Sequence, residues 1–178
     1  MPDADGRVSH LLLFPKAFGS QRAVSDFACC HLYYCNRAGY ICNNPEFTID
    51  RQHLDSYLML HVVSGLFHTE IKGRQQTVRA GETILIDLKQ PHRYWSDREQ
   101  ACEVLWLDFN CSEDKLSFLR TGTDWPYRFN NQAMQPFIYA FVLQYVHDSG
   151  FSEIRQSELI YRMLLLGIRE QKRGGETT

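Results

Sequence analysis

The sequence lacks the features that identify several common classes of protein. None of its six cysteines lies in a C-x-x-C pair, so the spacing typical of zinc ribbons is missing. The first apolar run, Leu11 to Phe14, is far too short for the core of a signal peptide or for a membrane span. The motifs G-x-S-x-G and H-E-x-x-H and a glycine-rich phosphate loop are also absent. We therefore expect no membrane segment and no catalytic residues.

The chain also lacks the positive charge that nucleic-acid-binding domains usually carry. It has 19 lysine and arginine residues against 21 aspartate and glutamate residues, which gives a formal net charge of −2. A domain that binds DNA through the phosphates is usually clearly basic. We expect this chain to contact DNA only through another domain.

The six thiols occur without an export signal, which fits a cytoplasmic protein. In that reducing compartment most cysteines behave as small buried apolar residues. The neighbouring pair Cys29 and Cys30 could form a redox sensor, but we expect both side chains to be buried.

The region from Phe47 to Phe109 dominates the chain. It consists of short apolar or alternating runs rich in Val, Ile, Leu, Tyr and Phe, separated by turn residues at Ser64-Gly65, Lys72-Gly73 and Ala80-Gly81. This pattern predicts antiparallel strands that close into a sandwich or barrel. A small barrel can hold one small ligand in its mouth.

Shorter elements flank this region. Phe27–Cys35 and Ala38–Cys42 are predicted as strands joined by a turn at Asn36-Arg37. After Phe109 a polar connector with a short helix near 113–119 leads to two helices. The first is apolar at Phe137, Ile138, Phe141, Val142 and Tyr145, and ends at Gly150. The second begins after Ser152, carries Gly167 on a broad apolar face, and ends at Gly174-Gly175.

Strand parity suggests which residues share a face. Arg51, His53 and Tyr57 have one parity, whereas Leu58 and Leu60 have the other. We expect the first set, with the polar groups, to line a pocket and the aliphatic set to face away from it.

The motifs FTIDR, VRAGET, PHRYW and EVLWLDF, together with the helix SELIYRMLLLGI, resemble the N-terminal ligand-binding domain of AraC-type bacterial transcription regulators. The resemblance implies an all-β cupin (a double-stranded β-helix, or jelly-roll barrel) with two C-terminal α-helices. It divides the chain into an arm (1–24), a ligand-binding barrel (25–112), a connector with a helical dimerisation element (113–172) and the start of a linker (173–178).

The resemblance also implies site residues. In the arabinose-responsive member an arginine, a tyrosine and a tryptophan contact the sugar, and their motif positions correspond to Arg51, Tyr94 and Trp106. His53 and His92 are added because their parity directs them toward the predicted pocket. Arginine offers a rigid fork of donors, and tryptophan a flat apolar surface for a ring. We predict that these five residues bind a small-molecule effector, either a sugar or another small metabolite.

The family resemblance implies a homodimer through the last helix, and we assign Ile160, Met163, Leu164 and Ile168 to that contact. The DNA-binding domain of such regulators is absent from this chain, so we expect an effector-sensing and dimerisation domain that is not itself an enzyme.

A small metal-dependent cupin enzyme, of the isomerase or dioxygenase type, is the alternative. The four ligand positions of metal cupins correspond here to Arg51, His53, Leu58 and His92. An arginine repels a metal ion and a leucine cannot bind one, and two remaining histidines make a weak site. We therefore expect neither a metal nor another cofactor.

Overall fold

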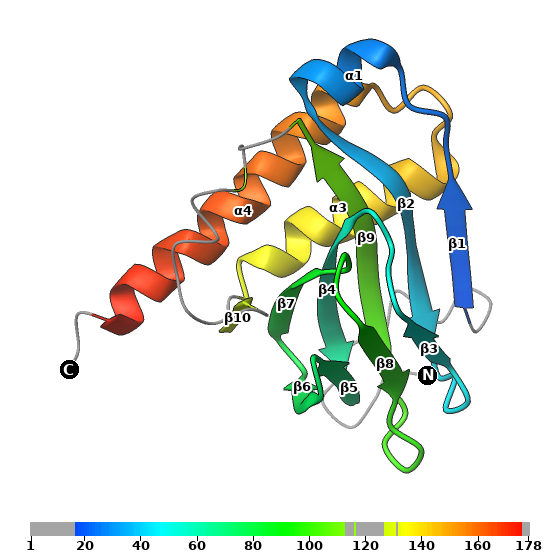
Figure 1. Ribbon diagram of the computed structural model, residues 1–178, viewed down its shortest axis with the longest axis vertical. Coiled ribbons are helices and arrows are strands. Elements are labelled where there is room, and N and C mark those ends of the chain that lie inside the picture. The colour runs from blue at the N-terminus through cyan, green and yellow to red at the C-terminus, as the bar shows by residue number, and fades with distance from the viewer. Residues whose placement is uncertain (1–16, 113–115, 117–126, 131, 176–178) are drawn as a thin grey trace.

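Two antiparallel sheets face each other in the computed structural model, which describes residues 17–112, 116, 127–130 and 132–175 (Figure 1). The larger sheet has the strand order β1-β2-β9-β4-β7-β10 and the smaller has the order β3-β8-β5-β6. The strands are β1 (Ala17–Gln21), β2 (Tyr33–Cys42), β3 (Thr48–Arg51), β4 (Tyr57–Ser64), β5 (Leu66–Ile71), β6 (Arg74–Arg79), β7 (Glu82–Asp87), β8 (His92–Ser96), β9 (Glu103–Cys111) and β10 (Tyr127–Asn130).

Three helices complete the described structure: α1 (Asp26–His31), α3 (Met134–His147) and α4 (Glu153–Gly175). The two long helices α3 and α4 lie across the outer face of the larger sheet. The predicted cupin barrel with two C-terminal helices is thereby confirmed.

The predicted turn at Lys72-Gly73 forms the hairpin between β5 and β6. Both residues have positive φ, 51° at Lys72 and 75° at Gly73. Two successive residues of positive φ make the type of turn whose twist matches that of paired strands. The local sequence therefore sets the register of this hairpin, in which Ile71 pairs with Arg74.

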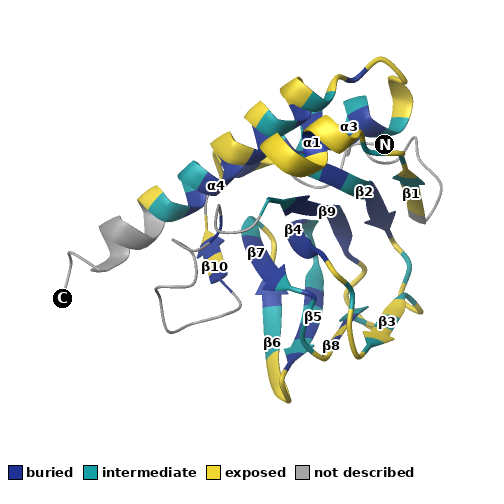
Figure 2. Ribbon diagram, turned by 45° about the horizontal axis from the view of Figure 1, so that its top comes forward, coloured by how far each residue is buried: buried dark blue, intermediate teal, exposed yellow. Residues whose placement is uncertain are grey.

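The chain buries two separate apolar cores. One lies between the sheets and includes Leu58, Leu60 and Val62, and the other lies between the larger sheet and the helices. Figure 2 shows the dark, buried strands of the larger sheet beneath α3 and α4. Both faces of this sheet are therefore apolar, as expected for strands covered on both sides.

This two-sided burial corrects the prediction from parity. Leu58 and Leu60 point into the barrel and line the same cavity as Arg51, rather than facing away from it. Parity does not carry from Arg51 to Leu58, because β3 ends at Arg51 and β4 begins only at Tyr57. Tyr57 itself belongs to the core beneath the helices.

The segment Phe27–Cys35, predicted as one strand, is also different in the structure. Residues 26–31 form α1, because the Ser25 hydroxyl caps the helix by accepting a hydrogen bond from the Ala28 N–H. Cys29 and Cys30 lie on this helix and are exposed, so the expectation that they are buried was wrong.

The predicted turn at Asn36-Arg37 is a β-bulge within a continuous β2. Cys35 pairs with Phe109 and Arg37 pairs with Asp108, so Asn36 is an extra residue opposite β9. Residues two apart in a regular strand share a face, whereas a bulge puts them on opposite faces. Cys35 therefore lies in the core under the helices and Arg37 lies in the barrel.

Other sequence-based expectations have mixed outcomes. Residues 17–21 of the predicted arm form β1, and β10 follows the predicted connector without having been predicted. Ser152 accepts a hydrogen bond from the Arg155 N–H at the start of α4, as expected for a cap. The rest of the arm and most of the short helix near 113–119 lie outside the described residues. No helix in the described part of the chain has the length and apolar character needed to span a membrane.

Candidate ligand-binding site

A cavity of about 110 Å³ lies inside the barrel, between the two sheets. Strands β2, β4 and β9 of the larger sheet form one wall, and β3, β8 and the residue before β3 form the other. Its lining residues are Arg37, Ile41, Phe47, Ile49, Arg51, Leu58, Leu60, Tyr94, Trp106 and Asp108.

An ion pair between a half-buried arginine and a buried aspartate occupies the polar end of this cavity. Arg37 donates to Asp108 Oδ2 at 2.6 Å, and the Asp108 residue is only 3% exposed. Its other oxygen, Oδ1, is buried and has no hydrogen-bond partner. Burial raises the pKa of Asp108 to about 6, although Arg37 and Arg51 favour the charged form.

Arg51 and Tyr94 face this ion pair from the smaller sheet. The charges of Asp108, Arg51 and Arg37 all act on the Tyr94 phenol, whose pKa is raised to about 12, mainly by burial. The ion pairs of the described chain do not include Arg51. One cationic side chain in the cavity wall therefore makes no ion-pair contact with any described residue.

Trp106 forms the apolar end of the cavity against a glycine surface. A Cβ atom at Gly39 would lie 2.8 Å from Trp106 Cζ2, and one at Gly19 would lie 3.0 Å from the same atom. Gly19 and Gly39 are register partners in β1 and β2, and Gly39 also pairs with Trp106 in β9. These two adjacent glycines, which have no side chains, thus make room for the indole.

Three of the five predicted ligand-binding residues, Arg51, Tyr94 and Trp106, line the cavity. His92 does not line it but is buried beside it, and its ring stacks on Tyr94 at 5.9 Å between centroids. His92 Nδ1 lies 2.8 Å from the Gln90 carbonyl oxygen, whereas its buried Nε2 has no partner. His92 is thus placed to orient Tyr94.

His53 lies outside this group. It is exposed in the loop after β3, where its Nδ1 contacts the Lys89 carbonyl oxygen at 3.1 Å. The structure therefore does not bring His53 together with the other four residues.

Sequence reasoning missed Arg37, Asp108 and most of the apolar lining. Asp108 carried one usable signal, because a charged residue within the apolar run Val104–Phe109 must be paired if that strand is buried. Arg37 could not be recognised as its partner without knowledge of the bulge.

The donor set does not fit a metal site of the cupin type. Two of the four corresponding positions are Arg51 and Leu58, which both line the cavity. No three His, Cys, Asp or Glu side chains among the described residues are grouped so that they could hold a metal ion.

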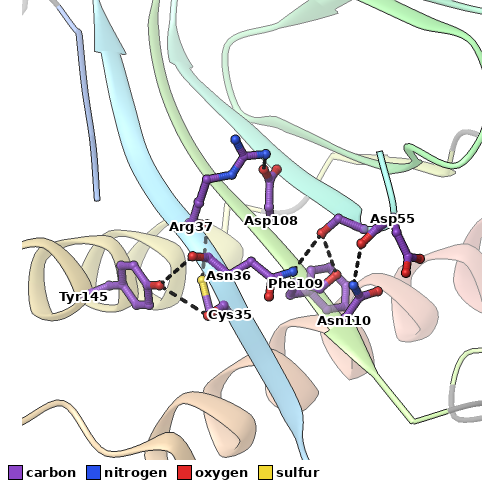
Figure 3. A network of polar contacts seen from close by, with 9 residues as sticks. Cys35, Asn36, Arg37, Asp55, Asp108, Phe109, Asn110 and Tyr145 are labelled. Carbon is purple, nitrogen blue, oxygen red and sulfur yellow. Dashed lines mark hydrogen bonds and ion pairs between the residues drawn. The ribbon is translucent and has the colours of Figure 1, made fainter. Parts of the chain in front are cut away.

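Hydrogen bonds connect the cavity wall to helix α3, as Figure 3 shows. The Tyr145 hydroxyl lies 3.2 Å from the Cys35 carbonyl oxygen and 3.0 Å from that of Asn36, and it donates to this pair. The Asn36 side chain in turn donates to Ser56 Oγ at 3.4 Å. The residue next to the cavity-lining Arg37 is thus held by α3.

The predicted dimerisation residues lie on the inner side of α4. Ile160, Met163 and Leu164 are buried in the core between the helices and the sheet, and Ile168 is partly buried against it. Gly167, expected to allow close approach of another helix, instead contacts Phe129 of β10, whose ring would lie 3.0 Å from an added Cβ.

Comparison with known families settles what kind of domain this is. The family model of the AraC-like ligand-binding domain matches residues 35–164, which include every element from β3 to α3 in full and most of β2 and the first half of α4. The chain belongs to this family. An AraC-like ligand-binding domain is a regulatory domain, which agrees with effector sensing in a transcription regulator.

Solved structures similar to this chain share little of its sequence. The protein YhaK from Escherichia coli has a TM-score of 0.50 and 8% identity, over 65% of this chain and 51% of that chain. The cupin domain of an XRE-family transcriptional regulator from Enterobacter cloacae has a TM-score of 0.40 and 14% identity, over 53% of this chain and 96% of that chain. This AraC-like chain thus spans about half the length of YhaK. No curated protein matches the sequence significantly.

Proposed function

We propose that this chain is the effector-sensing and dimerisation domain of an AraC-type bacterial transcription regulator, and that a small molecule binds in the barrel cavity. The observation that carries the proposal is the set of unsatisfied polar groups in the cavity wall. Buried polar groups are normally hydrogen-bonded, yet Asp108 Oδ1 is buried without a partner. The half-buried Arg51 in the same wall is in none of the ion pairs among the described residues. Such groups suit a ligand better than a closed core.

Binding would act on DNA through a domain outside this chain. A ligand that contacts Arg37 or Asp108 touches the bulge that Tyr145 of α3 holds. Differential contacts of this kind shift the population of two arrangements of the helices relative to the barrel. The proposed activity is therefore regulation by binding, without a chemical step.

A thermal-shift screen of small acids, sugars and polyols tests the cavity assignment. A ligand at a hundred times its dissociation constant stabilises the folded state by about 2.7 kcal/mol. Ile49→Trp fills the cavity from β3 and should abolish the shift. Thr48→Trp is the matched control, because Thr48 is the neighbouring residue on the opposite, exposed face of the same strand.

If a ligand still raises the unfolding temperature of the Ile49→Trp protein but no longer raises that of the Thr48→Trp protein, it binds outside the cavity and contradicts the proposal. A screen in which no compound shifts the unfolding temperature, while a chelator lowers it, would favour the metal-dependent cupin enzyme instead.

The dimer contact that we propose uses the outer face of α4. Ile154 is 68% exposed and Tyr161 is 46% exposed, and the two are seven residues apart on the helix. A seven-residue spacing places them on one stripe, as in helices that pair along their length. Because Ile160, Met163 and Leu164 are covered by the chain's own sheet, a second copy would pack against this stripe.

Sedimentation velocity over a range of concentrations tests this contact. Ile154→Glu places a charge in the stripe and should weaken the dimer about ten-fold or more, since a buried unpaired charge is costly. Thr48→Glu adds the same charge to the exposed face of the smaller sheet and should leave the dimer unchanged. Equal dimer constants for Ile154→Glu and the wild type would exclude this face of α4.

A further inference from the structure

The charges in the cavity wall do not balance. Arg37 and Asp108 form an ion pair, so their charges compensate each other. Arg51 contributes a second positive charge to the same wall. Two cations and one anion leave a net charge of +1 when Asp108 is ionised. A cavity with this charge favours an anion over a neutral molecule of the same size.

An anionic ligand in this cavity must also carry a hydrogen-bond donor, because one acceptor in the wall has no donor. Asp108 Oδ1 is a buried acceptor without a hydrogen bond. An unsatisfied buried carboxylate oxygen costs free energy that a ligand recovers if it donates an O–H there. Oδ1 would repel a second carboxylate, so the donor must be a separate group on the ligand.

The rest of the wall limits the size of the ligand. A cavity of about 150 Å³ admits a benzene ring, and this one is about 110 Å³. The space is therefore smaller than the benzene cavity and suits a compact ligand with a short carbon chain. Leu58 and Leu60 are almost completely buried and would contact a short carbon chain.

We infer that the effector is a short-chain hydroxy acid. Its carboxylate binds Arg51, and its hydroxyl group donates to Asp108 Oδ1. The Tyr94 phenol lies near both charged groups and supplies a further donor to the carboxylate. This inference rests on the proposed function, and it narrows the sugar or other small metabolite of that proposal to an acid.

Titration calorimetry with four-carbon probes tests both contacts on the unmodified chain. The probes are 2-hydroxybutyrate, 3-hydroxybutyrate, butyrate, and the amides of the two hydroxy acids. One of the hydroxy acids should bind about ten-fold or more tightly than butyrate, because butyrate leaves Asp108 unsatisfied. The same hydroxy acid should exceed its own amide by a similar factor, because the amide lacks the charge that pairs with Arg51.

Variants then assign each preference to a residue. Asp108→Asn should remove most of the preference for the hydroxy acid over butyrate. Arg51→Gln should remove most of the preference for the acid over its amide. Arg93→Gln is the matched control, because Arg93 is exposed on β8 and stacks over Trp95 on the outer side, so it should change neither preference.

Comparison of the probes on the wild type decides the matter even if a variant fails to fold. Equal affinities for butyrate and both hydroxy acids would overturn the role of Asp108, and equal affinities for acids and amides would overturn that of Arg51. A neutral polyol or sugar that binds more tightly than every acid, and is blocked by Ile49→Trp, would overturn the inference while the sensing function stands. If the acids still bind to the Ile49→Trp protein, that result would contradict both the inferred effector and the proposed binding in the cavity.

Discussion

Two buried titratable residues lie on opposite faces of the larger sheet, and burial affects their pKa values in opposite directions. Asp108 lies on the inner face, where desolvation raises its pKa from 3.8 to about 6. His61 lies in β4 and accepts or donates one hydrogen bond with Thr83 Oγ1 at 2.9 Å. Desolvation lowers the pKa of His61 from 6.5 to about 4. In each residue the neutral form is favoured in the folded state.

The two residues therefore affect the pH dependence of stability with opposite signs. The folded state binds the Asp108 proton more tightly than the unfolded state does, so this contribution is complete below pH 3.8 and is lost as the pH rises through about 6. The folded state binds a proton at His61 less tightly, so that contribution is present above pH 6.5 and is lost as the pH falls through about 4.

We predict that substitutions at these residues tilt the stability profile in opposite directions between pH 4 and 6.5. The Asp108→Asn protein lacks the stabilising contribution that the wild type loses as the pH rises. Its free energy of unfolding should therefore rise more steeply with pH than that of the wild type. In the His61→Gln protein the free energy of unfolding should rise less with pH than in the wild type, or should fall. Each difference should reach about 3 kcal/mol, since one pH unit is 1.36 kcal/mol. Urea unfolding at four pH values measures it, and parallel profiles for all three proteins would contradict the assignment.

The identity of single site residues was only partly predictable. Arg51, Tyr94 and Trp106 were found because each belongs to a local motif that resembles the AraC family. His53 was added from parity alone and lies in a loop, where parity carries no information about facing. Arg37 depends on a bulge, which the sequence does not mark.

At the scale of elements, the edge strand β1 depends on a residue without a side chain in β2. A Cβ at Gly39 would lie 2.0 Å from the Phe18 carbonyl oxygen and 2.8 Å from Gly19 Cα, in addition to its contact with Trp106. Two of these atoms belong to the backbone of β1, so the neighbouring strand would have to move. The pairing of β1 with β2 and the position of the indole therefore share one requirement.

We predict that Gly39→Ala destabilises the fold by about 2 kcal/mol, through overpacking, and displaces Trp106. Chemical unfolding measures the first effect and tryptophan fluorescence the second. Gly73→Asn is the control, because nothing lies within 4 Å of an added Cβ there and asparagine tolerates its positive φ. A Gly39→Ala protein as stable as Gly73→Asn would show that β1 is not held as described.

The type of an element was predicted correctly where a periodic pattern covered many residues. The prediction was wrong where a helix cap determined the structure. The fourteen residues of α3 repeat the apolar pattern over several turns, and the hairpin strands alternate between turn residues. The six residues of α1 are too few for periodicity, and their mixture of aromatic and small residues favoured a strand. The capping hydrogen bond at Ser25 makes them a helix instead.

At the scale of the whole molecule, the helical layer and the larger sheet are held together through Tyr145. Its ring stacks on Phe141 within the helical layer, and its hydroxyl reaches the backbone of β2. Arg22, between β1 and α1, lies over the same ring at 4.7 Å and donates to the Asp148 carbonyl oxygen at 2.6 Å. The end of α3 is therefore tied to two strands of the larger sheet.

We predict that Tyr145→Phe lowers the free energy of unfolding by about 1–2 kcal/mol, because the buried Cys35 carbonyl and the part-buried Asn36 carbonyl lose the donor that they share. Tyr161→Phe serves as control, since Tyr161 is partly exposed on α4 and such a change usually costs less than about 0.5 kcal/mol. Denaturant unfolding measures both. Equal stabilities of the two variants would show that the hydroxyl of Tyr145 does not fasten α3 to the barrel.

The extra residue in β2 also affects how such a domain can evolve. Loss of the single codon for Asn36 would leave Cys35 and Arg37 adjacent in a regularly alternating strand, so Arg37 would still face Asp108. The wall of the cavity would thus be inherited intact, whereas one carbonyl that holds Tyr145 would be gone. Descendants could therefore change how strongly their helices respond to an effector without changing which effector they recognise.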